Sequence, residues 1–311
     1  MRAETYVLVG TGGTGSYLIN LLVHYLNVKK EESKVILVDG DVLEKRNLLR
    51  QGFIQKDVGK NKAEVLLERF KRVANKNVTI ECHGDFVRSI DDIVDLVGNE
   101  QEVTLISCVD NNMARLRMLL AQYKIFFKEN RNITFIDGGN AEWEGQTLVN
   151  KIEERDVEPI IFGDEIRVNE SSEHVPNIIF EEGWKDTLTV GDFEMSCDEI
   201  VESAPQNILA NMTSAMGIMR RVNDKKQVRY QFDTRRGLQE EFKASTTGSK
   251  VLKEIVEYAN GEGKLNLIEG YLGEVGIDVE EGEEVGEGNE VVDEAELEEY
   301  LESFFSEDGD R

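Results

Sequence analysis

A glycine-rich loop near the N-terminus constrains the fold of this chain more than any other feature. The loop, Gly10-Thr11-Gly12-Gly13-Thr14-Gly15, follows an apolar run at 5–9 that predicts a buried strand. From Ser16 onward, apolar residues recur every three or four positions, which is the period of an amphipathic helix. Glycines let the backbone turn sharply and approach a phosphate, and the free N–H groups at a helix start attract that anion. The order therefore predicts nucleotide binding, with a tight turn that holds no ligand as the alternative.

Further apolar runs predict strands along the first half of the chain. They occupy residues 34–38, 77–82, 103–108 and 133–136. Strands that alternate with helices are typical of an α/β fold with a mainly parallel sheet. Residues 147–152 predict another strand, at which an antiparallel portion begins. We therefore expect a Rossmann-like, mainly parallel sheet flanked by helices and continuing into an antiparallel portion.

Polar residues follow the loop at intervals that indicate chemistry on phosphates. They are Asp39, Asp41, Asn47, Arg50, Gln51, Lys62 and Asp110. Asp39 directly follows the second predicted strand, where a carboxylate can accept hydrogen bonds from ribose hydroxyls. Arg50 and Lys62 suit phosphate oxygens, although each alone would be interpreted as ordinary surface charge. Asp110 follows a strand at the carboxyl edge of the sheet, where it can hold Mg²⁺ together with phosphate oxygens.

These residues stand in four blocks, GxGGxG, DxDxVxxxNLxRQ, VGxxK and CxDNxxxR, within residues 5–140. In order and spacing, the blocks resemble the family of ThiF, MoeB and the ubiquitin-activating enzymes. The resemblance implies that Asp39 holds the ribose of ATP, that Asn47, Arg50 and Lys62 contact its phosphates, and that Asp110 holds Mg²⁺. The implied cofactor-binding positions are Gly10, Gly12, Gly13, Gly15, Asp39, Asp41 and Gln51, and the implied catalytic positions are Asn47, Arg50, Lys62 and Asp110.

The resemblance also implies an activity and partners. The activity is ATP- and Mg²⁺-dependent adenylation of the C-terminal carboxylate of a small ubiquitin-like or sulfur-carrier protein, or of a peptide. Such carriers usually end in glycine, which is thin enough to pass under a crossover segment, here residues 153–196. The helix expected at 198–222 carries Asn207 and Asn211 on or near one face and would pack between the subunits of a homodimer.

Two other functions are weighed against adenylation. An NAD-dependent oxidoreductase would explain the glycine loop and Asp39, but it would leave Arg50, Lys62 and Asp110 without a role. A non-catalytic member of the same fold could bind ATP, or a carrier, as a scaffold. Calorimetry that compares ATP with NAD separates the first alternative from adenylation.

The cysteines and the N-terminus depart from the family pattern. The chain has Cys82, Cys108 and Cys197 but no Cys-x-x-Cys pair, so we expect no structural zinc. Cys82 and Cys108 lie in predicted strands and are typical of small core residues. Cys197 precedes a predicted helix and is a candidate covalent nucleophile, with a structural cysteine as the alternative. Only Arg2 could supply the arginine that relatives send into the neighbouring subunit's site.

Charge and composition argue against a nucleic-acid partner and a membrane partner. The net charge is −26, which argues against a nucleic-acid partner because phosphate binding needs a basic face. No apolar run reaches the roughly 18 residues of a membrane span, so no membrane partner is expected. Three cysteines without an evident pairing suit a reducing, cytoplasmic location.

The chain is expected to form an adenylation domain followed by an acidic tail. The domain covers residues 1–279, with a nucleotide half at 1–140 and a crossover, carrier and dimer half at 141–279. Residues 280–311 hold 15 of the 62 acidic residues against one basic residue, which indicates a linker. Within this tail, the apolar spacing at 292–305 predicts an acidic amphipathic helix whose docking surface stays open.

Overall fold

The computed structural model describes residues 3–110, 112–131, 133–152, 159–162, 166–169, 204–225 and 228–243. The chain divides into two compact units, Met1–Leu272 and Gly273–Arg311, and every described residue belongs to the first. The predicted boundary after residue 279, the acidic linker and the amphipathic helix at 292–305 lie outside the described residues. The predicted domain division therefore stays a prediction.

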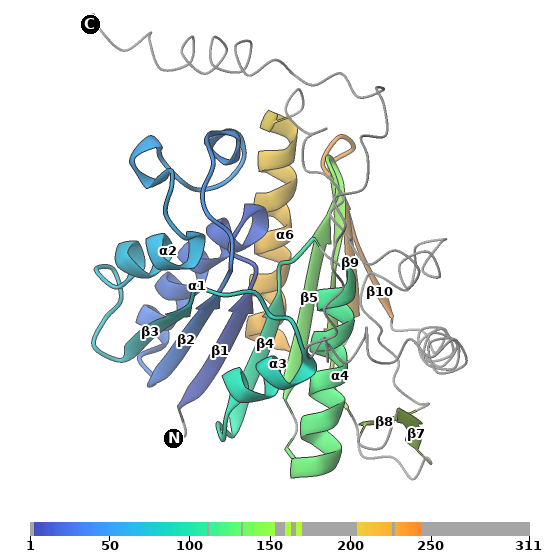
Figure 1. Cartoon of the computed structure of the whole chain (residues 1–311). Helices are drawn as coiled ribbons and strands as arrows, with labels where there is room; N and C mark the ends of the chain where they lie inside the picture. The colour runs from blue at the N-terminus through green and yellow to red at the C-terminus, as the bar shows by residue number, and fades with distance from the viewer. Residues whose placement is uncertain are drawn as a thin grey trace, which may run out of the picture. The chain divides into compact units, whose positions relative to one another are not determined.

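An eight-stranded sheet forms the centre of the first unit, in the order β10-β9-β6-β5-β4-β1-β2-β3 (Figure 1). Its strands are β1 (Glu4–Val9), β2 (Ser33–Val38), β3 (Val78–His83), β4 (Glu102–Ser107), β5 (Thr134–Asn140), β6 (Glu144–Asn150), β9 (Val228–Asp233) and β10 (Leu238–Lys243). β3, β2, β1, β4 and β5 run parallel, and β6, β9 and β10 continue the sheet with antiparallel pairings. The predicted fold class is confirmed, including the antiparallel portion.

Helices cover both faces of this sheet (Figure 1). They are α1 (Gly13–Lys29), α2 (Lys62–Phe70), α3 (Ile90–Val97), α4 (Asn112–Glu129) and α6 (Ala204–Asp224), with short 3-10 turns η1 (Lys45–Leu49) and η2 (Gln55–Asp57). The helix expected at 198–222 is present as α6, and residues 198–203 lie outside the described part. Within the connection expected to be irregular, β7 (Pro159–Phe162) and β8 (Ile166–Asn169) pair as a short antiparallel hairpin. The first segment is apolar and the second alternates apolar with polar residues, and both patterns are typical of short strands.

The alternation of side chains along β1 produces two separate apolar cores. Val7 and Val9 pack with residues of α3 and α4 on one face of the sheet. Tyr6 and Leu8 pack with residues of α1, α2 and α6 on the other. Because both faces are covered, β1 reads in the sequence as a continuous apolar run without polar alternation.

The strand order places the sheet's reversal point at β1. β1 lies between β2 and β4, so the chain leaves it in one direction towards β2 and β3 and later returns on the opposite side as β4. In open parallel sheets, ligands bind outside the carboxyl ends of the strands at such a point. The loops after β1, β2 and β4 therefore meet where the sequence predicts the nucleotide.

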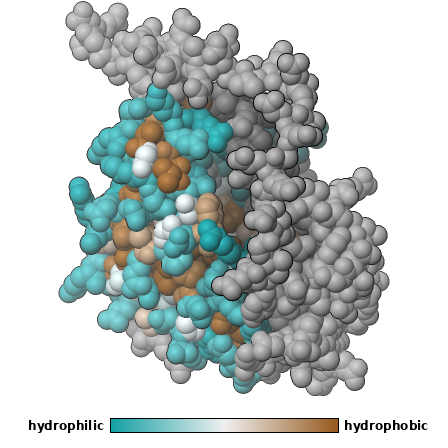
Figure 2. All heavy atoms as spheres, viewed as in Figure 1, coloured by the Kyte–Doolittle hydropathy of each residue, from teal (hydrophilic) through white to brown (hydrophobic). Residues whose placement is uncertain are grey.

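The surface is mixed in character. Figure 2 shows hydrophilic residues around the margin of the face in view, with hydrophobic residues gathered towards its upper part and middle. Within the described ranges, no helix combines the length and the apolarity that crossing a bilayer requires.

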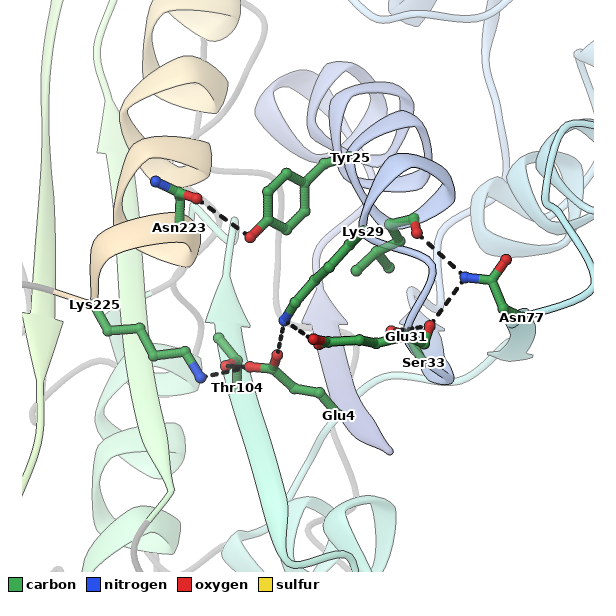
Figure 3. A network of polar contacts seen from close by, with 10 residues as sticks. Glu4, Tyr25, Lys29, Glu31, Ser33, Asn77, Thr104, Asn223 and Lys225 are labelled. Carbon is green, nitrogen blue, oxygen red and sulfur yellow. Dashed lines mark hydrogen bonds and ion pairs between the residues drawn. The ribbon is translucent and has the colours of Figure 1, made fainter. Parts of the chain in front are cut away.

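A partly buried ion-pair network joins the amino ends of the central strands to two helices (Figure 3). Glu4, at the start of β1, accepts hydrogen bonds from Lys29 Nζ at 3.0 Å and from Lys225 Nζ. Lys29 ends α1, and Lys225 follows α6. Thr104 of β4 donates to the same carboxylate at 3.4 Å. Glu4 thereby fixes both helices on one face of the sheet, at the edge opposite the predicted site.

The pKa of Glu4 follows from this network. Burial acts to raise it, but hydrogen bonds from Lys225, Tyr6 and Lys29 outweigh burial and hold the pKa below its ordinary value of 4.5. A carboxyl whose pKa is lowered on folding stabilises the fold above its ordinary pKa, and that stabilisation is lost as the pH falls through the lowered value.

We therefore expect Glu4→Gln to lower the free energy of unfolding at pH 7 by about 1–3 kcal/mol, because two lysines lose their charged acceptor. The difference from the wild type should shrink as the pH falls below 4.5. Denaturant unfolding across this pH range measures both effects. Glu81→Gln is the control, since Glu81 forms an exposed pair with Lys34 at 2.9 Å and should cost under about 0.5 kcal/mol. A deficit in Glu4→Gln that does not vary with pH would contradict the assignment.

Candidate active site

The glycine loop connects β1 to α1 through contacts that leave no room for a side chain. Gly10 has a φ of +87°, and a Cβ added there would lie 2.6 Å from the backbone oxygen of Cys108, after β4. A Cβ at Gly15 would lie 2.0 Å from the oxygen of Gly10. α1 begins at Gly13, so its first N–H groups, which lack partners within the helix, lie at this loop. The loop is therefore suited to bind an anion.

Asp39 follows β2 and is tied directly to the glycine loop. Its Oδ2 accepts hydrogen bonds from the N–H of Thr11 at 2.7 Å and from the Thr11 hydroxyl at 2.9 Å. Its Oδ1 accepts from the N–H of Asp41 at 2.9 Å. Burial raises the pKa of Asp39, although Lys62 and the two N–H donors act to lower it. The carboxylate is thus held beside the loop, at the position predicted for a ribose.

Lys62 brings a buried positive charge to the same place. It is the first residue of α2 and is only 7% exposed, and its Nζ lies 2.6 Å from Oδ2 of Asp41. Asn61 caps this helix by accepting a hydrogen bond from the N–H of Glu64 at 3.1 Å. The positive charge of Lys62 also acts to lower the pKa of Asp39.

Arg50 lies on the loop between β2 and α2, just after η1. The side chain of Asn47 shapes this turn, because its Oδ1 accepts from the N–H of Glu44 at 3.0 Å. The Asn47 carbonyl also accepts from the N–H of Gln51 at 2.9 Å. Among the residues that the structure describes, none forms a hydrogen bond or an ion pair with the Arg50 guanidinium. Lys62 has a carboxylate partner, whereas Arg50 keeps its donors available.

Gln51 packs against the glycine loop with an unused acceptor. It is 6% exposed, and its Nε2 would lie 3.5 Å from a Cβ added at Gly12. Its Oε1 is buried and accepts no hydrogen bond from the described part of the chain. A buried amide oxygen without a donor costs about 1–3 kcal/mol, so this oxygen is suited to receive a hydrogen bond from a bound group.

Asp110 and Arg115 follow β4 but have different surroundings. Asp110 is exposed at the carboxyl end of β4, beside the glycine loop's strand. Arg115 is buried, with its Nε 3.4 Å from Oδ1 of Asp137, and it donates to the Val109 carbonyl at 2.5 Å. Arg115 therefore supports the connection between β4 and α4. The described residues contain no cluster of three metal-ligating side chains, so a metal here would rely on Asp110 and on oxygens of a bound phosphate.

The two described cysteines are partly buried beside the apolar core. Cys108 and Cys82 both pack against the core that α1 and α2 cover. Burial raises the pKa of both thiols, which keeps them protonated and weakly nucleophilic. Cys197 and Arg2 lie outside the described residues, and their predicted roles stay predictions.

A cluster of asparagines, which we call the amide clamp, fastens α6 to the glycine loop. It consists of Asn140, at the end of β5, and Asn207 and Asn211, on α6. Thr14 donates to Asn140 Oδ1 at 2.7 Å and lies 3.2 Å from Asn211 Oδ1. Asn211 Nδ2 donates to Asn207 Oδ1 at 2.9 Å and lies 3.5 Å from the Arg50 carbonyl. The clamp thus links α6 to both the glycine loop and the Arg50 turn.

Sequence reasoning found part of this site. It placed Asn207 and Asn211 on or near one face of a helix, but the pattern carried no signal that this face meets the glycine loop. Asn140 was missed, although it lies just beyond the strand predicted at 133–136. Asn61 was also missed, and its spacing to Glu64 is a helix-capping signal that could have found it.

We expect Asn211→Ala to lower the free energy of unfolding by about 1–3 kcal/mol, because it leaves buried donors and acceptors of the clamp without partners. Asn223→Ala is the matched control on the same helix. Asn223 is exposed and accepts one hydrogen bond, from Tyr25 at 3.3 Å, so its loss should cost under about 0.5 kcal/mol. Thermal or denaturant unfolding measures the stability of the two variants. Equal losses of unfolding free energy in both would argue against a clamp.

The chain matches the model of the ThiF family over residues 1–181, which is more than half of its length. It belongs to the ThiF family. No curated protein matches it.

Several solved structures are similar in fold. The structure of E. coli MccB with MccA-N7isoASN has a TM-score of 0.51 and 17% identity, over 78% of this chain and 65% of that one. SeMet PaaA has a TM-score of 0.46 at 17% identity, over 78% and 64%. E. coli MccB with ATP has a TM-score of 0.48 at 18% identity, also over 78% and 64%. The chain thus spans a little under two thirds of these proteins, and at 17% identity the MccB likeness shows the fold.

Proposed function

We propose that this protein is an ATP-dependent adenylyltransferase. It activates the C-terminal carboxylate of a small ubiquitin-like or sulfur-carrier protein that ends in glycine, or of a peptide. The observation that carries this proposal is the tie of Asp39 to the glycine loop through Thr11. Lys62 pairs with the neighbouring Asp41, the turn that carries Arg50 contacts Asn211 through its backbone, and Asp110 follows the adjacent strand. Membership of the ThiF family supports it. A hydride-transferring enzyme would need no such cations.

The chemistry explains why the site needs fixed positive charge. In adenylation, a carboxylate oxygen attacks the α-phosphorus of ATP, and the bond to the departing pyrophosphate breaks. Both reactants are anions, so the barrier falls when cations already stand where negative charge gathers. Lys62 is fixed by its pair with Asp41, whereas Arg50 can turn its fork of donors to the phosphates as ATP enters.

The remaining parts of the nucleotide fit the other residues of the site. The N-terminus of α1 would hold phosphate oxygens, and Asp39 would accept hydrogen bonds from the ribose. Gln51 Oε1 would receive a donor that the described chain does not supply. Asp110 would hold Mg²⁺, which neutralises phosphate charge when it is bound.

A covalent second step would use Cys197. The Cys197 thiolate would attack the carbonyl carbon of the acyl adenylate, AMP would leave with the electrons of the broken C–O bond, and a thioester would form. Cys82 and Cys108 pack against the apolar core beside α1 and α2, so Cys197 is the candidate for this step.

We expect Arg50→Ala to lower the rate of pyrophosphate exchange into ATP about 10²- to 10³-fold, because the transition state loses a cation. The assay contains ATP, Mg²⁺ and a panel of small carrier proteins and peptides that end in glycine. Asp110→Ala should lower the rate of pyrophosphate exchange by a comparable factor.

Arg46→Ala is the matched control for Arg50→Ala. Arg46 lies on the same turn but is exposed and paired with Glu44 at 2.5 Å, so exchange should be retained. Exchange that survives both Arg50→Ala and Asp110→Ala removes the site assignment. Calorimetry in which NAD binds more tightly than ATP would overturn the proposed reaction itself.

The proposed active form is a homodimer that pairs through α6. Leu209, Met212 and Met216 recur at helical spacing on this helix, and all three are about half exposed. Large apolar side chains gathered on one helix face favour burial against a partner. A two-fold pairing would place the same face of α6 from each subunit against its copy.

We expect Met212→Glu combined with Met216→Glu to convert the dimer to a monomer, because each buried methionine would become a buried charge. Sedimentation velocity measures the change in mass. Val28→Glu places the same charge at an apolar position of α1 that is 78% exposed, and it should leave the dimer intact. A wild-type protein that sediments as a monomer at micromolar concentration would contradict this assembly.

A further inference from the structure

Phe86 is a large aromatic residue left half in solvent beside the candidate site. It follows β3 in the short connection to α3, and 51% of its surface is exposed. Its ring lies against Gly40, because a Cβ added at Gly40 would come within 2.5 to 2.7 Å of three ring carbons. Gly40 directly follows Asp39, so one side of the ring covers the backbone next to the predicted ribose site.

The connection that carries Phe86 is fastened on both sides. Asn61 Nδ2 donates to the carbonyl of Asp39 at 2.8 Å and to that of Gly84 at 3.2 Å, which joins the ends of β2 and β3. After Phe86, Asp92 Oδ2 accepts from the N–H groups of Arg88 at 2.8 Å and Ser89 at 2.9 Å. The loop is therefore held against the site before any ligand arrives.

Resting on the proposed nucleotide site, we propose that Phe86 is the stacking platform for the nucleobase of the bound ATP. The order of the strands supports this position. The phosphate-binding loop follows β1, the ribose carboxylate Asp39 follows β2, and Phe86 follows β3. These strands are neighbours in that order, so a nucleotide bound by the first two extends its base towards the third.

The chemistry of the position favours a flat, apolar group as the occupant. A phenyl ring offers a π-face and no hydrogen-bonding atom, so it suits the face of a purine and contributes affinity without choosing among bases. The ring is anchored in advance, and stacking on it requires little further ordering of the protein. Gly40 is explained by the same arrangement, since any side chain there would displace the ring.

The test separates the base from the phosphates. The dissociation constants of ATP and of inorganic tripolyphosphate are measured by calorimetry for the wild type, Phe86→Ala and Phe86→Trp. We expect Phe86→Ala to weaken ATP binding about 5- to 100-fold and to leave tripolyphosphate binding unchanged. Phe86→Trp should retain ATP affinity, and its added indole fluorescence should be quenched as ATP binds. Ile54→Ala removes a similarly exposed apolar side chain from a neighbouring loop and should change neither constant.

The outcomes distinguish this inference from the proposed function. A wild type that binds neither ATP nor tripolyphosphate removes the nucleotide site and the platform together. ATP affinity that is equal in the wild type and Phe86→Ala removes the platform and leaves the adenylation proposal standing. A parallel loss of ATP and tripolyphosphate affinity in Phe86→Ala would also overturn the stacking platform, because that result would report a disturbed phosphate site.

Discussion

The site depends on one steric constraint, the approach of the glycine loop to the backbone after β4. Gly10 lies against the Cys108 carbonyl, and Gly15 lies against Gly10 itself, at separations that exclude a Cβ. Because of this approach, α1 starts close to the carboxyl end of β4, and Asp39 can reach the N–H and hydroxyl of Thr11. A bulkier loop would move the N-terminus of α1 away from Asp39, and the site would lose the helix end that is suited to bind an anion.

Charge around this loop is arranged in two different ways. Lys62 is buried and paired with Asp41, which holds its ammonium in place. The Arg50 guanidinium has no partner in the described part of the chain, whereas its backbone carbonyl accepts hydrogen bonds from Asn211 and Tyr17, each at 3.5 Å. A paired cation provides a permanent field, whereas an unpaired one can follow charge to where it develops. In the proposed reaction, phosphate charge moves, and Lys62 and Arg50 would supply these two kinds of positive charge.

Contacts at both ends of the sheet hold α6 in place. At the amino end, Glu4 pairs with Lys225 after α6 and with Lys29 at the end of α1. At the carboxyl end, the amide clamp bonds Asn211 to the glycine loop through Thr14. α6 belongs to the half of the chain that is expected to meet the carrier. Two residues of the nucleotide half, Glu4 and Thr14, therefore help to position this helix.

The sequence alone determined the glycine loop, the parallel strands and the polar blocks, because apolar periodicity and short spacings are local properties of the chain. It therefore predicted Asp39, Arg50, Lys62 and Asp110 as candidates before their positions were known. Tertiary structure decided that Lys62 pairs with Asp41, that Asn140 meets Asn211 across 71 residues, and that the Phe86 ring covers Gly40. Such contacts join segments distant in sequence, and they exist only once the order of the strands has brought those segments to one edge of the sheet.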